Sequence, residues 1–338
     1  MATTDAYKAV INHIKPHPDA DSLELAYIGR RECVVKKGQF TIGQPILYIQ
    51  SDAQLNPELE WVQPFVPYIS KTGRVRAVRL RGVVSAGIIV LPESLPVDIN
   101  TLSDEEICEQ LQIDHYIIPE RSMSQEVRRP SLPYGIEKSD ETNYYALSEE
   151  ELHLGETVLI TRKMDGSSAV LYYDPESDNL EVCSRNLSLK TECFNNYTNA
   201  TLPYIAQVKA LASYFNGPVG IRGEVCGNRI NDSKVNRDSK HPLGFYMYGV
   251  RIPYMEDMNK RLGRWKSGCH FTDINRILKD EIGLPPIPTV RILGERVVTD
   301  EMLTYYKDRP ASEGEGVVVN GTSFTYKIKS DAYDAKLG

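Results

Sequence analysis

The chain has 338 residues, of which 41% are hydrophobic and 25% are charged, and this length and composition are typical of a globular protein with two domains. No apolar run approaches the roughly 18 residues of a membrane span and the first residues lack the apolar region of a signal peptide, so we expect a cytoplasmic protein without membrane contact. The six cysteines lack metal-ligand spacing, and the net charge of −7 excludes a protein that coats nucleic acid by bulk positive charge.

Residues 1–102 are predicted to form a small β-barrel of the OB-fold type. Short β-rich runs alternate with glycine-marked turns at the spacing of such a barrel. The expected strands are residues 9–11, 22–28, 32–35, 45–49, 74–80 and 88–91. In the fifth of these strands the arginines change phase, which predicts a β-bulge near Ala77 and Val78.

A local basic surface is expected in this first domain. Residues 61–92 contain no carboxylate, although the whole chain is acidic. The basic residues of this segment are Lys71, Arg74, Arg76, Arg79 and Arg81. Such a segment indicates a binding site for a phosphate backbone, and the alternative is a solvated sheet face.

Residues 103–130 are predicted to be a helix and a linker, and residues 131–338 a second domain. The helix opens at Asp104, with Ile107, Leu111 and Ile113 placed to pack on a neighbour, and residues 123–133 are the expected linker. The second domain is predicted to be α+β, with antiparallel sheets flanked by helices. Its expected helices are residues 201–215, 273–281 and 295–307, and its last strands are 315–320 and 323–330.

One short stretch in the second domain suggests covalent chemistry. A β-rich run ends in Lys163-Met164-Asp165-Gly166, which places an amine at a strand end before a tight turn. This tetrapeptide alone is a weak signal, since a surface hairpin with a solvated lysine has the same pattern. The segments that follow in order are Ser184-Arg185-Asn186, Gly223-Glu224, residues 245–248, Glu313-Gly314-Glu315-Gly316 and Lys327-Ile328-Lys329.

The ordered set resembles the motifs of the covalent nucleotidyltransferase superfamily of RNA ligases, DNA ligases and capping enzymes. The resemblance implies that Lys163 attacks the α-phosphorus of a nucleoside triphosphate. Its amine must then be neutral, and Lys327, Lys329 or a bound metal would lower its pKa. Lys327 and Lys329 alternate on one strand and would together neutralise the phosphate charge.

The resemblance also implies the partners of the nucleotide. Asp165, Glu224 and Glu315 would together hold one Mg²⁺ or Mn²⁺, and Gly166 permits the tight turn beside Asp165. Phe245 is the expected stacking partner of the nucleobase, with Tyr246 and Tyr248 on the opposite face of the strand as the other choice. Arg185 would contact ribose or an acceptor phosphate, and Asn186 would assist it.

Within the superfamily the chain is most similar to nick-sealing RNA ligases of the Deinococcus and Naegleria type, which carry an OB domain before the catalytic domain. Residues 14–25, 34–38 and 79–88 and Ser168 carry this likeness. It implies an ATP-dependent monomer that joins RNA, or an RNA-containing nicked duplex, through lysyl-AMP. The 3′-hydroxyl strand would be read through its 2′-hydroxyl.

Two departures from the family pattern leave alternatives open. Many relatives carry a glutamate one or two residues before the lysine to hold the adenine amine, where this chain has Thr161 and Arg162. Asn143 and Tyr145 stand where arginine and glutamine are expected. The alternatives are a GTP-dependent capping guanylyltransferase and an RNA-binding OB module on an inactive transferase.

Overall fold

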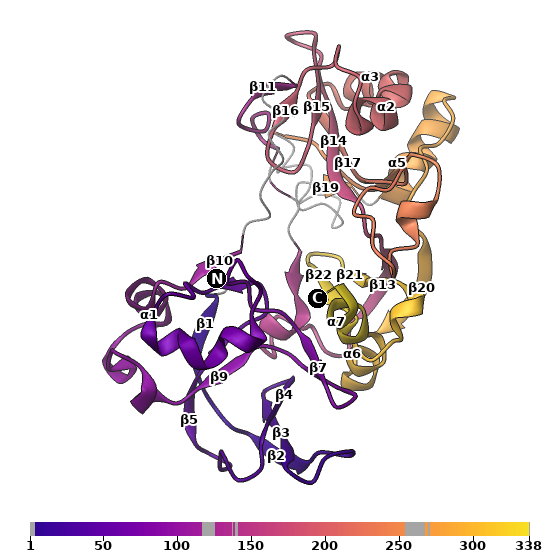
Figure 1. Ribbon diagram of the computed structural model, residues 1–338. Coiled ribbons are helices and arrows are strands. Elements are labelled where there is room, and N and C mark those ends of the chain that lie inside the picture. Colours follow the sequence, from indigo (N-terminus) through magenta and orange to yellow (C-terminus); the bar gives the residue numbers. More distant parts are fainter. Residues whose placement is uncertain are drawn as a thin grey trace. The chain divides into compact units, whose positions relative to one another are not determined.

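The computed structural model describes residues 4–116, 126–136, 138, 141–253, 268–269 and 271–337. Its internal contacts divide the chain into two compact units (Figure 1). The first unit is Met1–Pro119 with Ser330–Gly338, and the second unit is Glu120–Lys329. The C-terminal segment therefore belongs by its contacts to the first unit, although it follows the last strand of the second.

The first unit consists mainly of short strands. Two three-stranded antiparallel sheets have the orders β1-β5-β9 and β2-β3-β4, and β7-β8 and β6-β10 form two smaller pairs. The strands are β1 Ala6–Val10, β2 His13–Pro16, β3 Leu23–Ile28, β4 Arg31–Lys36, β5 Pro45–Ile49, β6 Ala53–Gln54, β7 Val78–Leu80, β8 Val83–Ser85, β9 Ile88–Val90 and β10 Asp114–His115. The helices are α1 Asp104–Leu111 and α7 Asp331–Leu337, with 3-10 turns at Glu60–Tyr68, Pro92–Ser94 and Ile99–Thr101.

Helix α1 forms as its sequence predicts. Ser103 and Glu106 make a reciprocal capping box that satisfies two backbone donors at its start. Ile107 and Leu111 are fully buried in a core that also contains Ile113. The hydrophobic spacing of this short segment therefore identified the face that packs.

The strand predicted over residues 74–80 is shorter than expected. Only single bridges connect Arg74 to Gln54 and Val75 to Ile69, and regular pairing begins at Val78 in β7. The change of phase among the arginines thus marks the start of a hairpin, and the predicted bulge is wrong. Arg81 at the hairpin turn has a positive φ of 48°.

The second unit contains two sheets. The seven-stranded antiparallel sheet has the order β11-β16-β15-β14-β17-β18-β19, and the five-stranded sheet has the order β12-β22-β21-β13-β20, with β12 and β22 parallel. The strands are β11 Val127–Arg129, β12 Thr142–Asn143, β13 Thr157–Lys163, β14 Ser167–Asp174, β15 Asn179–Cys183, β16 Ser188–Leu189, β17 Val219–Cys226, β18 Gly244–Arg251, β19 Gly268–Cys269, β20 Ile292–Val297, β21 Gly316–Asn320 and β22 Thr325–Lys329.

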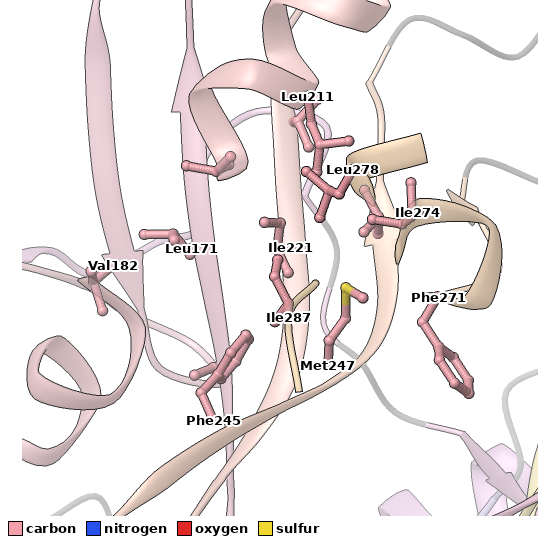
Figure 2. Packing of buried hydrophobic residues seen from close by; sticks show 14 of the residues in the cluster. Leu171, Val182, Leu211, Ile221, Phe245, Met247, Phe271, Ile274, Leu278 and Ile287 are labelled. Atoms are coloured by element: carbon pink, nitrogen blue, oxygen red, sulfur yellow. The ribbon is translucent and has the colours of Figure 1, made fainter. Parts of the chain in front are cut away.

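Helices cover one face of the seven-stranded sheet. The helices of this unit are α2 Asn196–Thr201, α3 Ile205–Phe215, α5 Phe271–Arg276 and α6 Asp300–Lys307, with a π-helical turn Ile277–Ile282 and 3-10 turns at Tyr144–Ala146, Leu202–Tyr204, Asp238–Lys240 and Ala311–Glu313. α3 and α5 pack on the sheet around buried residues such as Leu171, Leu211 and Ile221 (Figure 2). None of the described helices is long and apolar enough to cross a membrane.

Two predicted elements need correction. The helix expected over residues 295–307 begins only at Asp300, after the N-cap Thr299, because Ile292–Val297 pairs with β13 as the edge strand β20. The linker expected over residues 123–133 contains β11, which pairs with β16. Residues 123–125 of that linker lie outside the described part of the chain.

Candidate active site

Lys163 is the last residue of β13, in the five-stranded sheet. Its Nζ lies 2.9 Å from Oε2 of Glu315, and Nζ of Lys329 lies 3.6 Å from the other carboxylate oxygen of Glu315. The carboxylate therefore lies between two lysines. All three side chains are largely buried, with 10% of the Glu315 side chain exposed.

The sheet register explains how residues far apart in sequence meet. Gly316 pairs with Lys163 on one side and with Lys329 on the other. A side chain at Gly316 would place its Cβ 2.2 Å from the carbonyl oxygen of Ile328, and its φ is +153°. Glycine at this position thus permits the close strand approach that brings Glu315 to both lysines.

The charges at this site hold the Lys163 amine in its protonated form. Burial alone would lower the pKa of Lys163, but the Glu315 and Glu224 carboxylates outweigh burial and raise it above its usual value. Lys329 opposes this rise, as expected from the sequence, yet it does not overcome the acids. Lys329 therefore lowers the pKa of Lys163 as predicted, but without a bound metal the two acids outweigh it.

Glu315 and Glu224 have opposite responses to the same surroundings. Burial would raise the pKa of Glu315, but Lys163 and Lys329 together hold it below its usual value. Lys327 of β22, which pairs with Val318 of β21, adds to this effect. Burial raises the pKa of Glu224 to about 8, and the charge of Glu315 contributes to the rise.

The two glutamates repel each other, and a hydrated divalent cation would stabilise both of their charges. Glu315 is buried and Glu224 is half-buried. Desolvation and the charge of Glu315 raise the pKa of Glu224 although Lys163 lowers it. Hard carboxylate oxygens with a deficit of positive charge are the donor set that Mg²⁺ or Mn²⁺ prefers. The described residues contain no group of three His, Cys, Asp or Glu side chains placed to hold a metal directly. The prediction that Asp165, Glu224 and Glu315 together hold one metal ion, through its waters, stays a prediction.

Asp165 and Gly166 lie in the crossover from β13 to β14, which passes from one sheet to the other. Asn231 donates a hydrogen bond of 3.3 Å to the Asp165 carboxylate. A Cβ on Gly166 would lie 2.4 Å from the carbonyl oxygen of Val225 and 2.5 Å from Sγ of Cys226. Gly166 is therefore required because β17 approaches its backbone closely.

Phe245 lies in the hydrophobic core and not at the site. It is 1% exposed, packs 6.1 Å from the ring of Tyr204, and lies among Leu171, Ile221 and Ile287 in Figure 2. This burial contradicts the prediction that it stacks on a nucleobase. The physical reason is strand alternation, because this face of β18 is the one that packs on the helices.

The opposite face of β18 is the one that carries Glu224. Tyr246 pairs with Glu224 across the β17–β18 ladder, so the two side chains share a face. The hydroxyls of Tyr248 and Ser168 are 2.9 Å apart, and Ser168 pairs with Glu224 on the other side of β17. Tyr246 and Tyr248 are thus the aromatic residues of β18 on the same sheet face as Glu224.

Arg185 and Asn186 form a tight turn after β15. The amide of Ser184 donates to the carbonyl of Leu187 at 2.9 Å, which closes the turn. Arg185 is exposed and Asn186 is half-buried. Their predicted contacts with ribose and phosphate stay predictions.

The five basic residues of the first unit have different surroundings. Lys71, Arg79 and Arg81 are exposed, and Arg76 is half-buried. Arg74 is engaged within the protein, because its Nε donates to Asp52 at 2.8 Å and its guanidinium lies 4.6 Å from the ring centroid of Tyr116. Arg74 therefore has a structural role that the sequence pattern did not indicate.

Sequence reasoning missed a set of polar residues around the crossover. Asn231, Asn236 and Asp238 lie in the polar loop formed by residues 227–241, and all three bind the backbone of residues 165–166. Polar loops are usually solvated, so their composition gave no warning. The only signal in the sequence was the clustering of asparagine and aspartate in the loop after Gly227.

Comparison with known proteins identifies both parts of the chain. A family model described as RNA ligase matches residues 156–329, just over half of the chain, and an OB-fold domain model matches residues 7–93. These matches confirm the predicted OB-fold and the predicted resemblance to RNA ligases. No protein with a curated description matches the sequence.

Solved structures with the same fold span the whole chain. An apo variant of a Naegleria gruberi RNA ligase is 22% identical, with a TM-score of 0.79 over 97% of each chain. Naegleria gruberi RNA ligase with pyrophosphate is 24% identical, with a TM-score of 0.77 over 98% of this chain and 97% of that chain. A further variant of that ligase, with ATP and manganese, is 22% identical, with a TM-score of 0.77 over 97% and 98%. The predicted order of an OB-fold followed by an α+β domain is confirmed.

Proposed function

The chain belongs to the RNA ligase family, and from this premise we propose that it is an ATP-dependent ligase that joins 3′-hydroxyl and 5′-phosphate RNA ends at nicks through a lysyl-AMP intermediate. The observation that carries the proposal is the cluster of Lys163, Glu315 and Lys329, with Nζ–Oε distances of 2.9 and 3.6 Å. An amine, an acid and a second amine are thereby brought together at the ends of three neighbouring strands, β13, β21 and β22.

In the first step the neutral amine of Lys163 attacks the α-phosphorus of ATP. A nitrogen–phosphorus bond forms, the bond from the α-phosphorus to the bridging oxygen breaks, and pyrophosphate leaves with the electron pair. Lys327 and Lys329 neutralise the charge on the phosphate oxygens as it develops. AMP is then transferred to a 5′-phosphate, and a 3′-hydroxyl displaces it to form the phosphodiester.

The Lys163 amine must lose a proton before it attacks, and the two glutamates oppose this loss. Glu224 and Glu315, with Asp165 acting through water, would hold a hydrated Mg²⁺ or Mn²⁺. When bound, the cation supplies positive charge that offsets the glutamates and polarises the phosphate. A variant of the Naegleria gruberi RNA ligase was solved with ATP and manganese, which supports this choice of nucleotide and metal.

The remaining contacts are assigned by position. Tyr246 or Tyr248 meets the nucleobase in place of Phe245, because both share the face of Glu224. Arg185 and Asn186 contact ribose or an acceptor phosphate. The exposed Lys71, Arg79 and Arg81, with Arg76, bind the nucleic-acid backbone. We further propose that the enzyme works as a cytoplasmic monomer.

Radiolabelling tests the central step. The protein is incubated with α-labelled ATP or GTP and with magnesium or manganese, and is then separated on a denaturing gel. We expect label from ATP on the wild type and none on Lys163→Ala. The matched control is Lys209→Ala, which removes an exposed lysine paired with Asp178 and should leave labelling intact. Labelling by GTP alone would favour a capping enzyme, and labelling of Lys163→Ala would overturn the proposal.

A further inference from the structure

The crossover between the two sheets of the second unit lacks the support of a sheet ladder. β13 ends at Lys163 and β14 begins at Ser167, so residues 164–166 pass between the sheets as irregular backbone. Buried peptide groups in such a segment need other partners. The position of the Lys163 amine depends on how firmly this backbone is held.

Side chains of the polar loop, residues 227–241, supply these partners. The amide of Asp165 donates to Oδ2 of Asp238 at 3.2 Å, and Nδ2 of Asn236 donates to the carbonyl of Asp165 at 3.0 Å. Nδ2 of Asn231 donates to the carbonyl of Gly166. Both polar groups of the Asp165 backbone are therefore satisfied by one loop.

The loop is itself held in a defined conformation. Asn236 also donates to the carbonyl of Asn231 at 2.9 Å and accepts from the amide of Ser239 at 3.2 Å. Asn236 is 1% exposed and Asp238 is 4% exposed. Hydrogen bonds within the loop therefore hold Asn236 in the conformation that contacts the crossover.

An ion pair between a half-buried arginine and a buried aspartate connects the loop to the strand that ends at Lys163. Oδ1 of Asp238 lies 3.0 Å from Nη2 of Arg162, the residue that directly precedes Lys163. The guanidinium of Arg162 also lies 3.4 Å from the point where a Cβ on Gly314 would stand, and Gly314 directly precedes Glu315. The pair of Arg162 and Asp238 therefore lies against both segments that carry the Lys163–Glu315 contact.

We propose that Asp238 and Asn236 are positioning residues that fix the crossover, and with it the Lys163 amine, for attack on the α-phosphorus. Arg162 is the charge partner of Asp238, and this ion pair accounts for an arginine at position 162. The inference rests on the proposed function for its kinetic test. Neither Asp238 nor Asn236 is assigned a contact with the nucleotide.

Two isosteric substitutions test the assignment. Asn236→Asp replaces a donor that faces two carbonyls by an acceptor, and Asp238→Asn removes the charge that pairs with Arg162. We expect the single-turnover rate constant of lysyl-AMP formation at saturating ATP to fall about 100-fold, because small displacements of a reacting group have effects of this size. The KM for ATP should change by less than about threefold, since binding contacts are retained.

A second ion pair of the same unit provides the matched control. Arg129 and Glu181 pair at 2.9 Å with a Glu181 side chain that is 1% exposed, and they do not contact the crossover. Glu181→Gln should reduce stability and the fraction of active protein while leaving the rate constant unchanged. Arg162→Lys, which keeps the positive charge, should recover part of the rate that Arg162→Met loses. Equal slowing by Glu181→Gln, or an Asp238→Asn rate within about twofold of wild type, would overturn the inference.

Hydrogen exchange separates this inference from the proposed function. If the wild type forms no lysyl-AMP, the proposed function fails, and the exchange rate of amides 163–167 then decides the positioning role alone. Faster exchange in Asn236→Asp than in wild type and Glu181→Gln would support it. Equal exchange in all three proteins would overturn it.

Discussion

Lys163 and Glu315 form an ion pair of 2.9 Å although 152 residues separate them in the sequence. The pair sets the resting state of the site, because the acid stabilises the ammonium form of the amine that must attack. Without a bound metal, the proposed nucleophile Lys163 is therefore protonated. Its activation requires additional positive charge near the carboxylate, which a nucleotide-bound metal would bring.

Removing the Glu315 charge should lower the pKa of Lys163. In Glu315→Gln the burial of the amine and the charge of Lys329 both favour the neutral form, and only Glu224 still opposes them. In nucleotide-free Glu315→Gln, an amine-reactive reagent should therefore begin to modify Lys163 at a lower pH than it does in wild type. Mass spectrometry of the Lys163 peptide across a pH series measures this midpoint.

Glu313→Gln is the matched control for this experiment. Glu313 lies two residues before Glu315 but pairs with Arg309, so its loss should leave the Lys163 midpoint in place. Nucleotide transfer by Glu315→Gln should still fall about 100-fold or more, since a group that organises charge at the reacting atoms is lost. An unchanged Lys163 midpoint in Glu315→Gln would contradict the electrostatic account.

The raised pKa of Glu224 predicts a pH-dependent loss of stability in metal-free protein. Between the usual glutamate pKa near 4.5 and the folded value of about 8, the unfolded chain releases this proton and the folded protein retains it. Stability from this group is therefore present below pH 4.5 and is lost as pH rises to 8. The side chain at position 224 does not titrate in Glu224→Gln. The unfolding temperature of this variant, measured relative to that of wild type, should therefore rise by a few degrees between pH 4.5 and pH 8.

Metal should reverse this difference. With chelator, calorimetry at pH 5 and pH 8 should show that wild type falls relative to Glu224→Gln as pH rises. With magnesium or manganese at pH 8, wild type should be stabilised and Glu224→Gln should respond less, because binding to the folded state alone raises stability. Equal pH dependence of both proteins would mean that Glu224 ionises normally.

The residues that meet at Lys163 were predictable because their ordered motifs resemble those of the covalent nucleotidyltransferase superfamily. Lys327 and Lys329 alternate along one strand, and Glu315 directly precedes the glycine that pairs with both Lys163 and Lys329. Motif order is enough to place such residues together. The sign of the resulting pKa shift was not predictable, because it depends on distances to buried charges.

Phe245 shows where the pattern is ambiguous. Alternation in β18 defines two faces, yet both carry aromatic residues, and the sequence does not state which face the helices cover. The polar loop fails for a different reason, since Asn236 and Asp238 are buried by contacts with a segment about 70 residues earlier. Local composition cannot reveal a burial that comes from tertiary contacts.

Equivalent substitutions on the two faces of β18 should have different consequences. Phe245→Leu removes part of a fully buried side chain, so it should cost about 1–3 kcal/mol of stability and leave the KM for ATP unchanged. Tyr246→Leu or Tyr248→Leu should raise the KM for ATP about tenfold, since stacking on a base contributes about 1–3 kcal/mol. Thermal unfolding and initial rates of lysyl-AMP formation measure both effects. A raised KM in Phe245→Leu, with normal values in both tyrosine variants, would restore the original assignment.

Arginines of the first unit should separate into a structural and a binding class. Arg74→Ala removes the partner of Asp52 and the cation over Tyr116, so it should lower the unfolding temperature. Arg81→Ala removes an exposed charge at the turn between β7 and β8 and should leave that temperature unchanged. It should instead weaken binding to nicked RNA and reduce the slope of log affinity against log salt by about one.

Comparing the steps of the reaction completes this test. Arg81→Ala should seal nicks more slowly than wild type while forming lysyl-AMP at the normal rate, because the first unit is assigned to the nucleic acid and not to ATP. Arg30→Ala provides a matched loss of an arginine outside residues 61–92. If Arg30→Ala and Arg81→Ala reduce sealing and the salt slope equally, the effect reflects net charge, and the assigned basic surface is wrong.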